Sequence, residues 1–335
     1  MAINAEKEIK NMTKVRLEDV AEHANVSPTT VSRVLNNRGS ISDKTRKKVN
    51  DAIDELGYFP NEIARSLYGN KSKLIGVLFP NVANPFYGEM VTEIETILSE
   101  EGYKVLICNT NNNLDKETKY LKMLLSNQVD GIIVGSRNHP SEIYQKANLP
   151  IVAIDRFVSK NVPNVRSDNY HGACLATEYL IGKKCQKIVL FTGSQEEEIK
   201  RGDNRIKGYI DTLTKHDRKL FIFKVSFDED EGFQRRKINE YLDMHPDIDG
   251  AFATGDTLAG ILNTAALQRK QKIEIVGYDG TEAFLNFCGN ISTIKQPVKE
   301  MAQVAITVML EIIAGNYQKD DREHILPVTL VESSY

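Results

Sequence analysis

Apolar positions recur at helical spacing in three short segments near the start of the chain, at residues 17–24, 28–36 and 42–56. Each apolar stripe covers one face of a helix, so the three helices can bury these faces against one another. The second helix has a clear start, because the Ser27 side chain can cap its first amide groups and Pro28 needs no amide hydrogen there. The pattern predicts a small unit of three helices.

From residue 74 onward the pattern changes to continuous apolar runs of strand length that alternate with helical segments. Such runs are typical of strands buried on both faces of a parallel sheet, with right-handed connections between them. Strands are predicted at 74–80, 103–109, 131–136, 150–156, 187–193, 220–227, 250–255, 273–280 and 325–333. Helices are predicted between them, including a short one at 141–148 and a last one at 297–314. The rhythm occurs twice, which predicts two α/β halves of similar size.

The outward face of the second helix carries hydroxyl, amide and guanidinium groups, on Thr29, Thr30, Ser32, Arg33 and Asn36. A helix that reads base edges in the major groove of DNA needs such groups. An ordinary helical hairpin, whose polar face is only solvated, would show the same residues. Basic residues then crowd into a short span opposed by one acid, Asp43, which favours a DNA-binding helix-turn-helix: Arg38, Lys44, Arg46, Lys47 and Lys48.

The formal net charge of the 335 residues is −3, which looks unfavourable for a DNA-binding protein. The charge is unevenly distributed, however. Residues 14–73 carry 11 basic and 8 acidic side chains, whereas residues 74–335 carry a net charge of −6. A basic segment joined to an acidic body suits site-specific DNA binding by the basic segment, because phosphates repel the body.

The segments VRLEDVAEHANVSPTTVSRVLN, SDKTRKKV and LGYFPNEIARSL follow one another between residues 15 and 67. In order, spacing and residue type they resemble the DNA-binding headpiece of the LacI/GalR repressor family. The resemblance extends over about residues 14–333. It implies that the headpiece contacts double-stranded operator DNA through Leu17, Ser27, Thr29, Thr30, Ser32, Arg33 and Asn36.

The resemblance also implies a role for residues 60–73. In the family this segment is a hinge helix that becomes ordered on DNA, where Asn61 and Ala64 contact the minor groove and Leu67 wedges between base pairs. An apolar wedge unstacks a base step, and the bent DNA then gains contacts. The residues alone are equally explained by a plain interdomain linker, because a helix this short is marginal by itself.

The resemblance implies a fold of class α/β with an N-terminal three-helix headpiece and a hinge helix. A periplasmic-binding-protein-like core of two doubly wound α/β lobes follows them. The expected parts are a disordered tail at 1–13 (with Met12 as a possible start), a headpiece at 14–59, the hinge at 60–73 and a sugar-binding core at 74–335. Lobe one is expected at about 74–160 plus 297–320, and lobe two at about 165–290 plus 324–335. The chain is expected to cross between the lobes near 156–166, 291–297 and 317–324.

Ligands of open α/β sheets lie outside the carboxyl ends of the strands. Polar, charged and aromatic side chains gather at these predicted ends and at the crossovers: Asn84, Phe86, Tyr87, Asp155, Arg156, Ser167, Asp168, Arg205, Asp256, Asp279 and Gln296. Planar polar groups bind sugar hydroxyls in pairs, and aromatic rings pack on sugar C–H faces. Strand-end acids and an Asp–Arg pair without any ligand would give the same pattern.

The resemblance favours the sugar site, because Asn84, Phe86, Asp155, Arg156, Arg205, Asp279 and Gln296 match effector positions of the family. Phe227 matches an aromatic residue that flanks the sugar. One position departs from the family pattern, since Gly255 precedes Asp256 where the family usually has Asn. Losing that amide leaves either room or a missing hydrogen bond at this point, so a direct copy of the ribose pocket is not expected.

Four segments, NPFYGEM, LICN, NQVDGII and VGYDGTEAF, look most like repressors of sucrose operons, with repressors of ribose operons second. The expected effector is a sugar or sugar phosphate, and no cofactor is expected. A homodimer is expected rather than a tetramer, because the sequence has no C-terminal heptad repeat through which two dimers could associate. A global catabolite regulator of the same family, which binds a phosphorylated carrier protein, is an alternative.

Other classes of protein need features that the sequence does not show. A sugar-binding transport protein needs export, but residues 1–13 contain no apolar signal segment and no later run is long enough to span a membrane, so a cytoplasmic protein is expected. An enzyme would need a phosphate loop or an acid–base pair, and neither GxxxxGK[ST] nor GxGxxG occurs. The four cysteines are scattered and lack metal-ligand spacing, so no metal site and no catalytic residue are expected.

Overall fold

The computed structural model of the protein describes residues 15–59, 72–126, 129–135, 144, 149–193, 204–226, 231–318 and 322–333. The chain forms two compact units, Met1–Ser72 and Lys73–Tyr335. The predicted tail at 1–13, nearly all of the predicted hinge and most of the predicted helix 141–148 lie outside the described residues.

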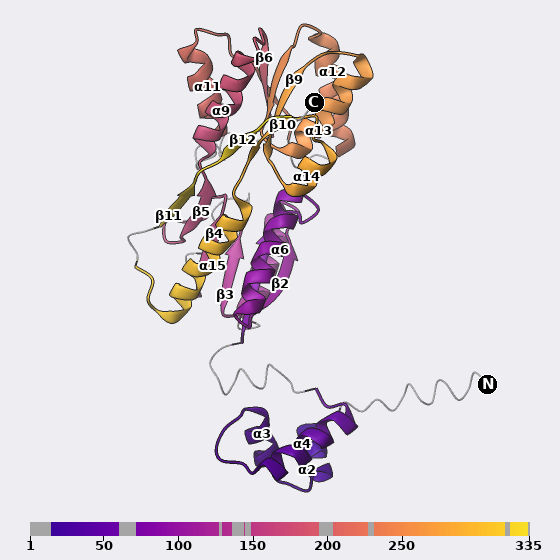
Figure 1. The fold of residues 1–335 in the computed structure, drawn as a ribbon, viewed down its shortest axis with the longest axis vertical. Coiled ribbons are helices and arrows are strands. Elements are labelled where there is room, and N and C mark those ends of the chain that lie inside the picture. The colour runs from indigo at the N-terminus through magenta and orange to yellow at the C-terminus, as the bar shows by residue number, and fades with distance from the viewer. Residues whose placement is uncertain are drawn as a thin grey trace, which may run out of the picture. The chain divides into compact units, whose positions relative to one another are not determined.

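The first unit contains three helices, α2 (Leu17–His23), α3 (Pro28–Leu35) and α4 (Asp43–Leu56), as the apolar spacing predicts (Figure 1). Their apolar faces meet in one small core of Val20, Ala21, Ala24, Val31, Val34, Val49 and Ala52. The Ser27 hydroxyl accepts from the Thr30 amide at 3.2 Å and so caps α3. This unit therefore holds α3 through local capping and a shared apolar core.

The first lobe of the second unit is a sheet of six parallel strands in the order β11-β5-β4-β3-β1-β2. Its elements are β1 (Leu74–Phe79), α6 (Pro85–Glu100), β2 (Lys104–Asn109), α7 (Leu114–Ser126), β3 (Gly131–Val134), β4 (Ile151–Ile154), β5 (Asn164–Ser167), α15 (Val298–Ala314) and β11 (Glu323–Leu326). Alternate side chains of β1 point to opposite faces. Ile75, Val77 and Phe79 pack with α6 and α15, and Leu78 packs with α7. Both faces are buried, which explains the continuous apolar run.

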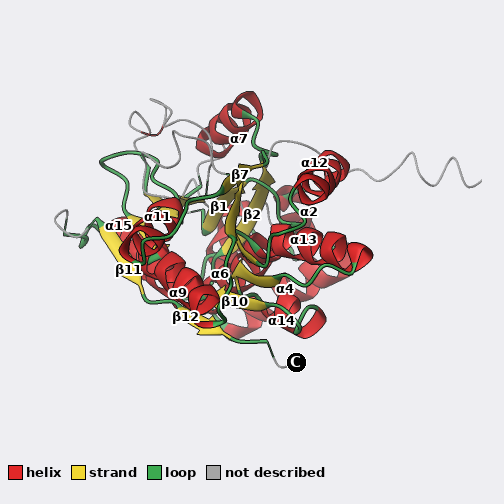
Figure 2. Cartoon of the chain, turned by 90° about the horizontal axis from the view of Figure 1, so that it is seen from above, coloured by secondary structure: helices red, strands yellow, loops and turns green. Residues whose placement is uncertain are grey.

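The second lobe is a sheet in the order β12-β10-β9-β8-β6-β7, in which β12 runs antiparallel to β10 and the other pairs are parallel. Its elements are α9 (Asn169–Gly182), β6 (Ile188–Thr192), α11 (Arg205–Lys215), β7 (Ile222–Lys224), α12 (Glu231–Met244), β8 (Gly250–Ala253), α13 (Asp256–Arg269), β9 (Glu274–Asp279), α14 (Glu282–Phe287), β10 (Ser292–Lys295) and β12 (Thr329–Val331). Figure 1 and Figure 2 show α9 and α11 on one face of this sheet and α12, α13 and α14 on the other. The two doubly wound α/β lobes expected from the sequence are confirmed.

The chain crosses between the two sheets after β5, after β10 and after β11. The second crossing agrees with the prediction, but the first and third come later than predicted, because β5 and β11 pair in the first sheet. The lobe-two ranges 165–290 and 324–335 are therefore wrong at their starts. The run 325–333 is not one strand but parts of β11 and β12, separated at Pro327. Proline has no amide hydrogen for a strand ladder, so the chain leaves one sheet there and joins the other.

Three short elements, β5, β10 and α14, were not predicted from the sequence, because each is too short to give a clear period. Among the described residues, no helix has the length and apolar character needed to cross a membrane. The same residues contain no group of three or more His, Cys, Asp or Glu side chains arranged to hold a metal ion.

Candidate functional site

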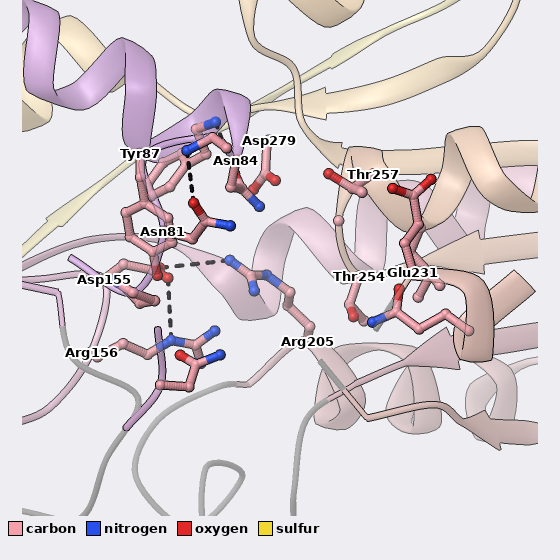
Figure 3. Close-up of a pocket in the computed structure, with 17 residues that line it drawn as sticks. Asn81, Asn84, Tyr87, Asp155, Arg156, Arg205, Glu231, Thr254, Thr257 and Asp279 are labelled. Carbon is pink, nitrogen blue, oxygen red and sulfur yellow. Dashed lines mark hydrogen bonds and ion pairs between the residues drawn. The ribbon is translucent and has the colours of Figure 1, made fainter. Parts of the chain in front are cut away.

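A pocket of about 310 Å³ lies between the two lobes, at the carboxyl ends of β1, β4, β8 and β9 (Figure 3). Its volume is in the range of small-molecule sites. The pocket brings together residues that the sequence predicted to bind an effector: Asn84, Phe86, Tyr87, Asp155, Arg156, Arg205 and Asp279. Phe227, also predicted there, lies outside the described residues.

Asp155 lies between two guanidinium groups on one side of the pocket (Figure 3). Its Oδ2 is 3.4 Å from Arg156 Nε, and its Oδ1 is 3.6 Å from Arg205 Nη2. All three residues are at most 8% exposed. Arg205 also packs over the ring of Tyr278, with its guanidinium carbon 4.2 Å from the ring centroid. Because Asp155 follows β4 and Arg205 begins α11, this ion pair joins the two lobes.

Gln296 does not line the pocket but positions a residue that does. Its Nε2 donates to Asp279 Oδ1 at 2.8 Å, and its Oε1 accepts from Ser167 Oγ at 2.7 Å. Ser167 ends β5 and Gln296 follows β10, so the hydrogen bonds connect two of the three crossings between the lobes. Gln296, predicted to contact an effector, is therefore linked to the pocket wall through its hydrogen bond to Asp279.

Asp256, predicted as an effector ligand, is also buried behind the pocket rather than in its wall. Its Oδ1 accepts from Thr293 Oγ1 at 2.6 Å, and its Oδ2 accepts from the Gly280 amide at 2.7 Å. These bonds fix the turn that follows β9 and carries Asp279. Burial, aided by the negative charge of Asp279, raises the pKa of Asp256 to about 8.

The raised pKa of Asp256 predicts a pH dependence of stability. The folded protein binds this proton more tightly than the unfolded chain, so the stabilisation is present at acidic pH and is lost as the pH rises from about 4 to about 8. We expect the melting temperature to fall more steeply between about pH 5 and about pH 9 in the native protein than in Asp256→Asn, which carries no titrating group. Differential scanning calorimetry measures both slopes. Equal slopes would contradict a protonated Asp256 at neutral pH.

Several pocket residues were missed from the sequence: Asn81, Asn112, Glu231, Gln234, Thr254 and Thr257. Asn81, Asn112 and Thr254 follow β1, β2 and β8, so the same strand-end rule would have found them. Glu231 and Gln234 lie in the first turns of α12. Nothing in their local sequence indicates that this helix faces the pocket.

The headpiece presents part of the predicted DNA-reading surface on α3. Thr29 and Arg33, one helical turn apart, are exposed on the same side of the helix. Ser27 and Thr30 bond to each other at 2.9 Å as part of the cap, and the Asn36 amide donates to the Ser32 carbonyl oxygen at 2.8 Å.

The other predicted DNA contacts have different surroundings. Leu17 is half-buried against the headpiece core. Asn61, Ala64 and Leu67 lie outside the described residues.

The two units match two family models. Residues 16–61 match bacterial regulatory proteins of the lacI family, and residues 72–328 match the periplasmic binding proteins and sugar binding domain of the LacI family. The chain is 40% identical to the sucrose operon repressor of Lactococcus lactis subsp. lactis, over 94% of this chain and 98% of the relative. It is 36% identical to the ribose operon repressor of Halalkalibacterium halodurans, over 96% of each.

A solved structure of a LacI-family regulator has a similar fold. The lac repressor dimer bound to operator and the anti-inducer ONPF superposes with a TM-score of 0.80 at 26% identity, over 96% of this chain and 98% of that one. The family predicted from the headpiece sequence is confirmed, and so is the prediction that the chain is no enzyme, because its relatives are regulators. The chain belongs to the LacI family of bacterial regulatory proteins.

Proposed function

We propose that the protein is a DNA-binding repressor of a sucrose-utilisation operon, and that a sugar bound between the lobes releases it from the operator. The observation that carries this proposal is a pocket of buried Asp, Arg and aromatic side chains, joined in one chain to a helix-turn-helix that exposes Thr29 and Arg33. Similarity to sucrose operon repressors supports sucrose as the operon's substrate. Similarity to ribose operon repressors makes ribose the second candidate. Such a repressor acts in the cytoplasm and needs no cofactor.

The geometry suggests how a sugar changes the core. A sugar in the pocket meets Asp155 and Arg156 of the first lobe and Arg205 and Asp279 of the second. Because its hydroxyls bond to side chains of both lobes at once, the bound sugar stabilises a different angle between the lobes. The sugar binds one arrangement of the lobes more tightly than the other, and the arrangement that it favours binds DNA less tightly. The two sites are therefore linked by a coupling free energy. The predicted hinge at 60–73 is the segment through which this change reaches the headpiece.

A second direct contact between the lobes responds to the same movement. Glu89 on α6 accepts from the amide of Glu282 at 2.9 Å, at the start of α14. Burial of the Glu89 carboxyl raises its pKa, so this contact has a desolvation cost. The contact exists only while the two lobes keep their present distance, and a change in lobe angle breaks it.

Repression by this fold requires two headpieces, because the two halves of a pseudopalindromic operator are read by a two-fold dimer. Phe287, at the end of α14, is 87% exposed and is an aromatic side chain of the kind that anchors interfaces. We expect Phe287→Asp to raise the dimer dissociation constant about 30-fold or more, since interface anchors contribute ~2 kcal/mol or more. Sedimentation velocity measures the change.

The control for this variant is Ile325→Asp. Ile325 is 50% exposed on β11, at the opposite edge of the first sheet from β2. The variant adds the same charge at an exposed apolar position that we place outside the dimer interface. Equal dissociation of both variants, or of neither, would contradict an interface at Phe287.

The function itself is tested by titrating the protein into labelled DNA from upstream of sucrose-utilisation genes, with unrelated DNA as competitor. We expect tight, salt-sensitive binding that a sugar weakens. Release by ribose and not by sucrose or fructose would establish the ribose alternative. Binding that no sugar relieves would contradict the proposal and indicate a regulator that depends on a carrier protein. A sugar-binding transport protein would bind sugar and no DNA.

A further inference from the structure

Polar side chains lie on two sides of the pocket, and Arg205 reaches from the second lobe toward Asp155 (Figure 3). One group is Asp155, Arg156 and Arg205. The other, on the second lobe, contains Glu231 at the start of α12 and Thr254 and Thr257 around the start of α13.

Gly255 lies between β8 and α13, beside the second group, and nothing in the backbone requires glycine there. Its φ of −169° is extended and is open to any residue. A Cβ built at this position would have one described atom within 4 Å, Asp279 Oδ2 at 3.7 Å, which is an ordinary contact. By contrast, a Cβ on Gly280 would meet the Lys295 backbone at 2.4 Å. The consequence of glycine at 255 is therefore open space in the pocket next to Asp279.

Glycine also leaves the start of α13 without a side-chain cap. Within the described residues, no hydrogen bond reaches the amides of Thr257 or Leu258, both of which line the pocket. Other helices near the pocket are capped, α6 by Asn84 and α14 by Thr281. A ligand oxygen above Gly255 can take the place of the missing cap.

The first group contains a buried hydrogen-bond acceptor that lacks a donor in the part of the chain that the structure describes. Asp155 Oδ1 is buried and receives no hydrogen bond from the described residues, because Arg205 Nη2 at 3.6 Å is beyond hydrogen-bond distance. A buried carboxylate oxygen of this kind favours a hydroxyl donor. The pocket thus offers an acceptor at one side and amide donors at the other.

We propose that the effector is a two-ring sugar, with one ring on Asp155 and Arg205 and the second above Gly255, where an oxygen caps α13. This inference rests on the proposed function, since it names the class of sugar that the same pocket takes. Gly255 is then the specificity-determining position, because its missing side chain makes room for the second ring.

The test compares Gly255→Asn with the native protein by isothermal titration calorimetry, using sucrose, fructose and glucose. Asn fills the space beside Asp279 and caps α13 itself. We expect its dissociation constant for sucrose to rise about tenfold or more, and that for a monosaccharide to change less than about threefold. Gly260→Asn is the matched control, on the same helix with no described atom within 4 Å of an added Cβ, and should bind sucrose as the native protein does. The melting temperature of Gly255→Asn should equal or exceed the native value.

Three outcomes would overturn the inference: an unchanged sucrose affinity in Gly255→Asn, an equal loss for sucrose and monosaccharide, or a native protein that prefers a monosaccharide. The proposed function fails differently. In that case the native protein binds only operator DNA, only sugar, or neither of them, and no sugar releases the DNA.

Discussion

Arg33→Ala is expected to lower operator affinity by about 10- to 100-fold, because a good contact between a guanidinium and a base pair contributes ~1–3 kcal/mol. Arg33 is exposed on α3, one turn after Thr29, and its helix is fixed by the buried Val31 and Val34. The headpiece core does not need its side chain. Fluorescence anisotropy with labelled operator at one fixed salt concentration measures the loss.

The control for Arg33 is Arg236→Ala, which removes an exposed guanidinium from α12 of the second lobe. It should bind operator as tightly as the native protein. Sugar affinity should be native in both variants, because neither side chain lines the pocket. Native operator affinity in Arg33→Ala would contradict the assignment of α3 as the reading helix.

Asp155→Ala is expected to give a repressor that sugar no longer releases, with sugar affinity lowered about 100-fold or more. Removing one partner of a buried charge pair also lowers the stability of the fold by ~3–5 kcal/mol, because the remaining charge is left uncompensated. Here two guanidiniums, of Arg156 and Arg205, lose the carboxylate between them, and the sugar loses its buried acceptor. Calorimetry with sucrose measures the affinity, and operator anisotropy at rising sucrose measures release.

Loss of stability is separated from loss of binding by Asp155→Asn, which keeps the size of the side chain and removes only its charge. It should melt closer to the native temperature and still bind sugar weakly. Asp211→Ala, an exposed carboxylate that bonds to Tyr170 outside the pocket, is the control for a general charge effect. If Asp155→Ala releases operator at the same sucrose concentrations as the native protein does, the assignment of the pocket is wrong.

The headpiece could be predicted from sequence because its information is local. Ser27, Pro28 and the apolar stripes each act within one or two helical turns, and α2, α3 and α4 agree with them. The core strands β1, β3 and β4 could be predicted for a related reason, since strands buried on both faces give continuous apolar runs. The strand-end rule then identified most of the first group of pocket residues.

The parts that were missed depend on tertiary placement. The edge strand β11 is only half apolar, and its membership in the first sheet is decided by pairing with β5 at a distance of more than 150 residues. Asp256 and Gln296 are residues of the type that binds sugars, but both lie behind the pocket. Asp256 accepts a hydrogen bond from Thr293, and Gln296 donates one to Asp279. Glu231 reaches the pocket only because α12 packs beside α13.

Energetic coupling between the sugar pocket and the operator-reading headpiece must be reciprocal, so that each ligand weakens the binding of the other. Sucrose affinity should be measured twice by calorimetry, with the free protein and with the protein saturated by operator DNA. We expect operator to weaken sucrose binding by the same factor by which sucrose weakens operator binding, about 5- to 150-fold for coupled sites. Equal sucrose affinity with and without operator would contradict it.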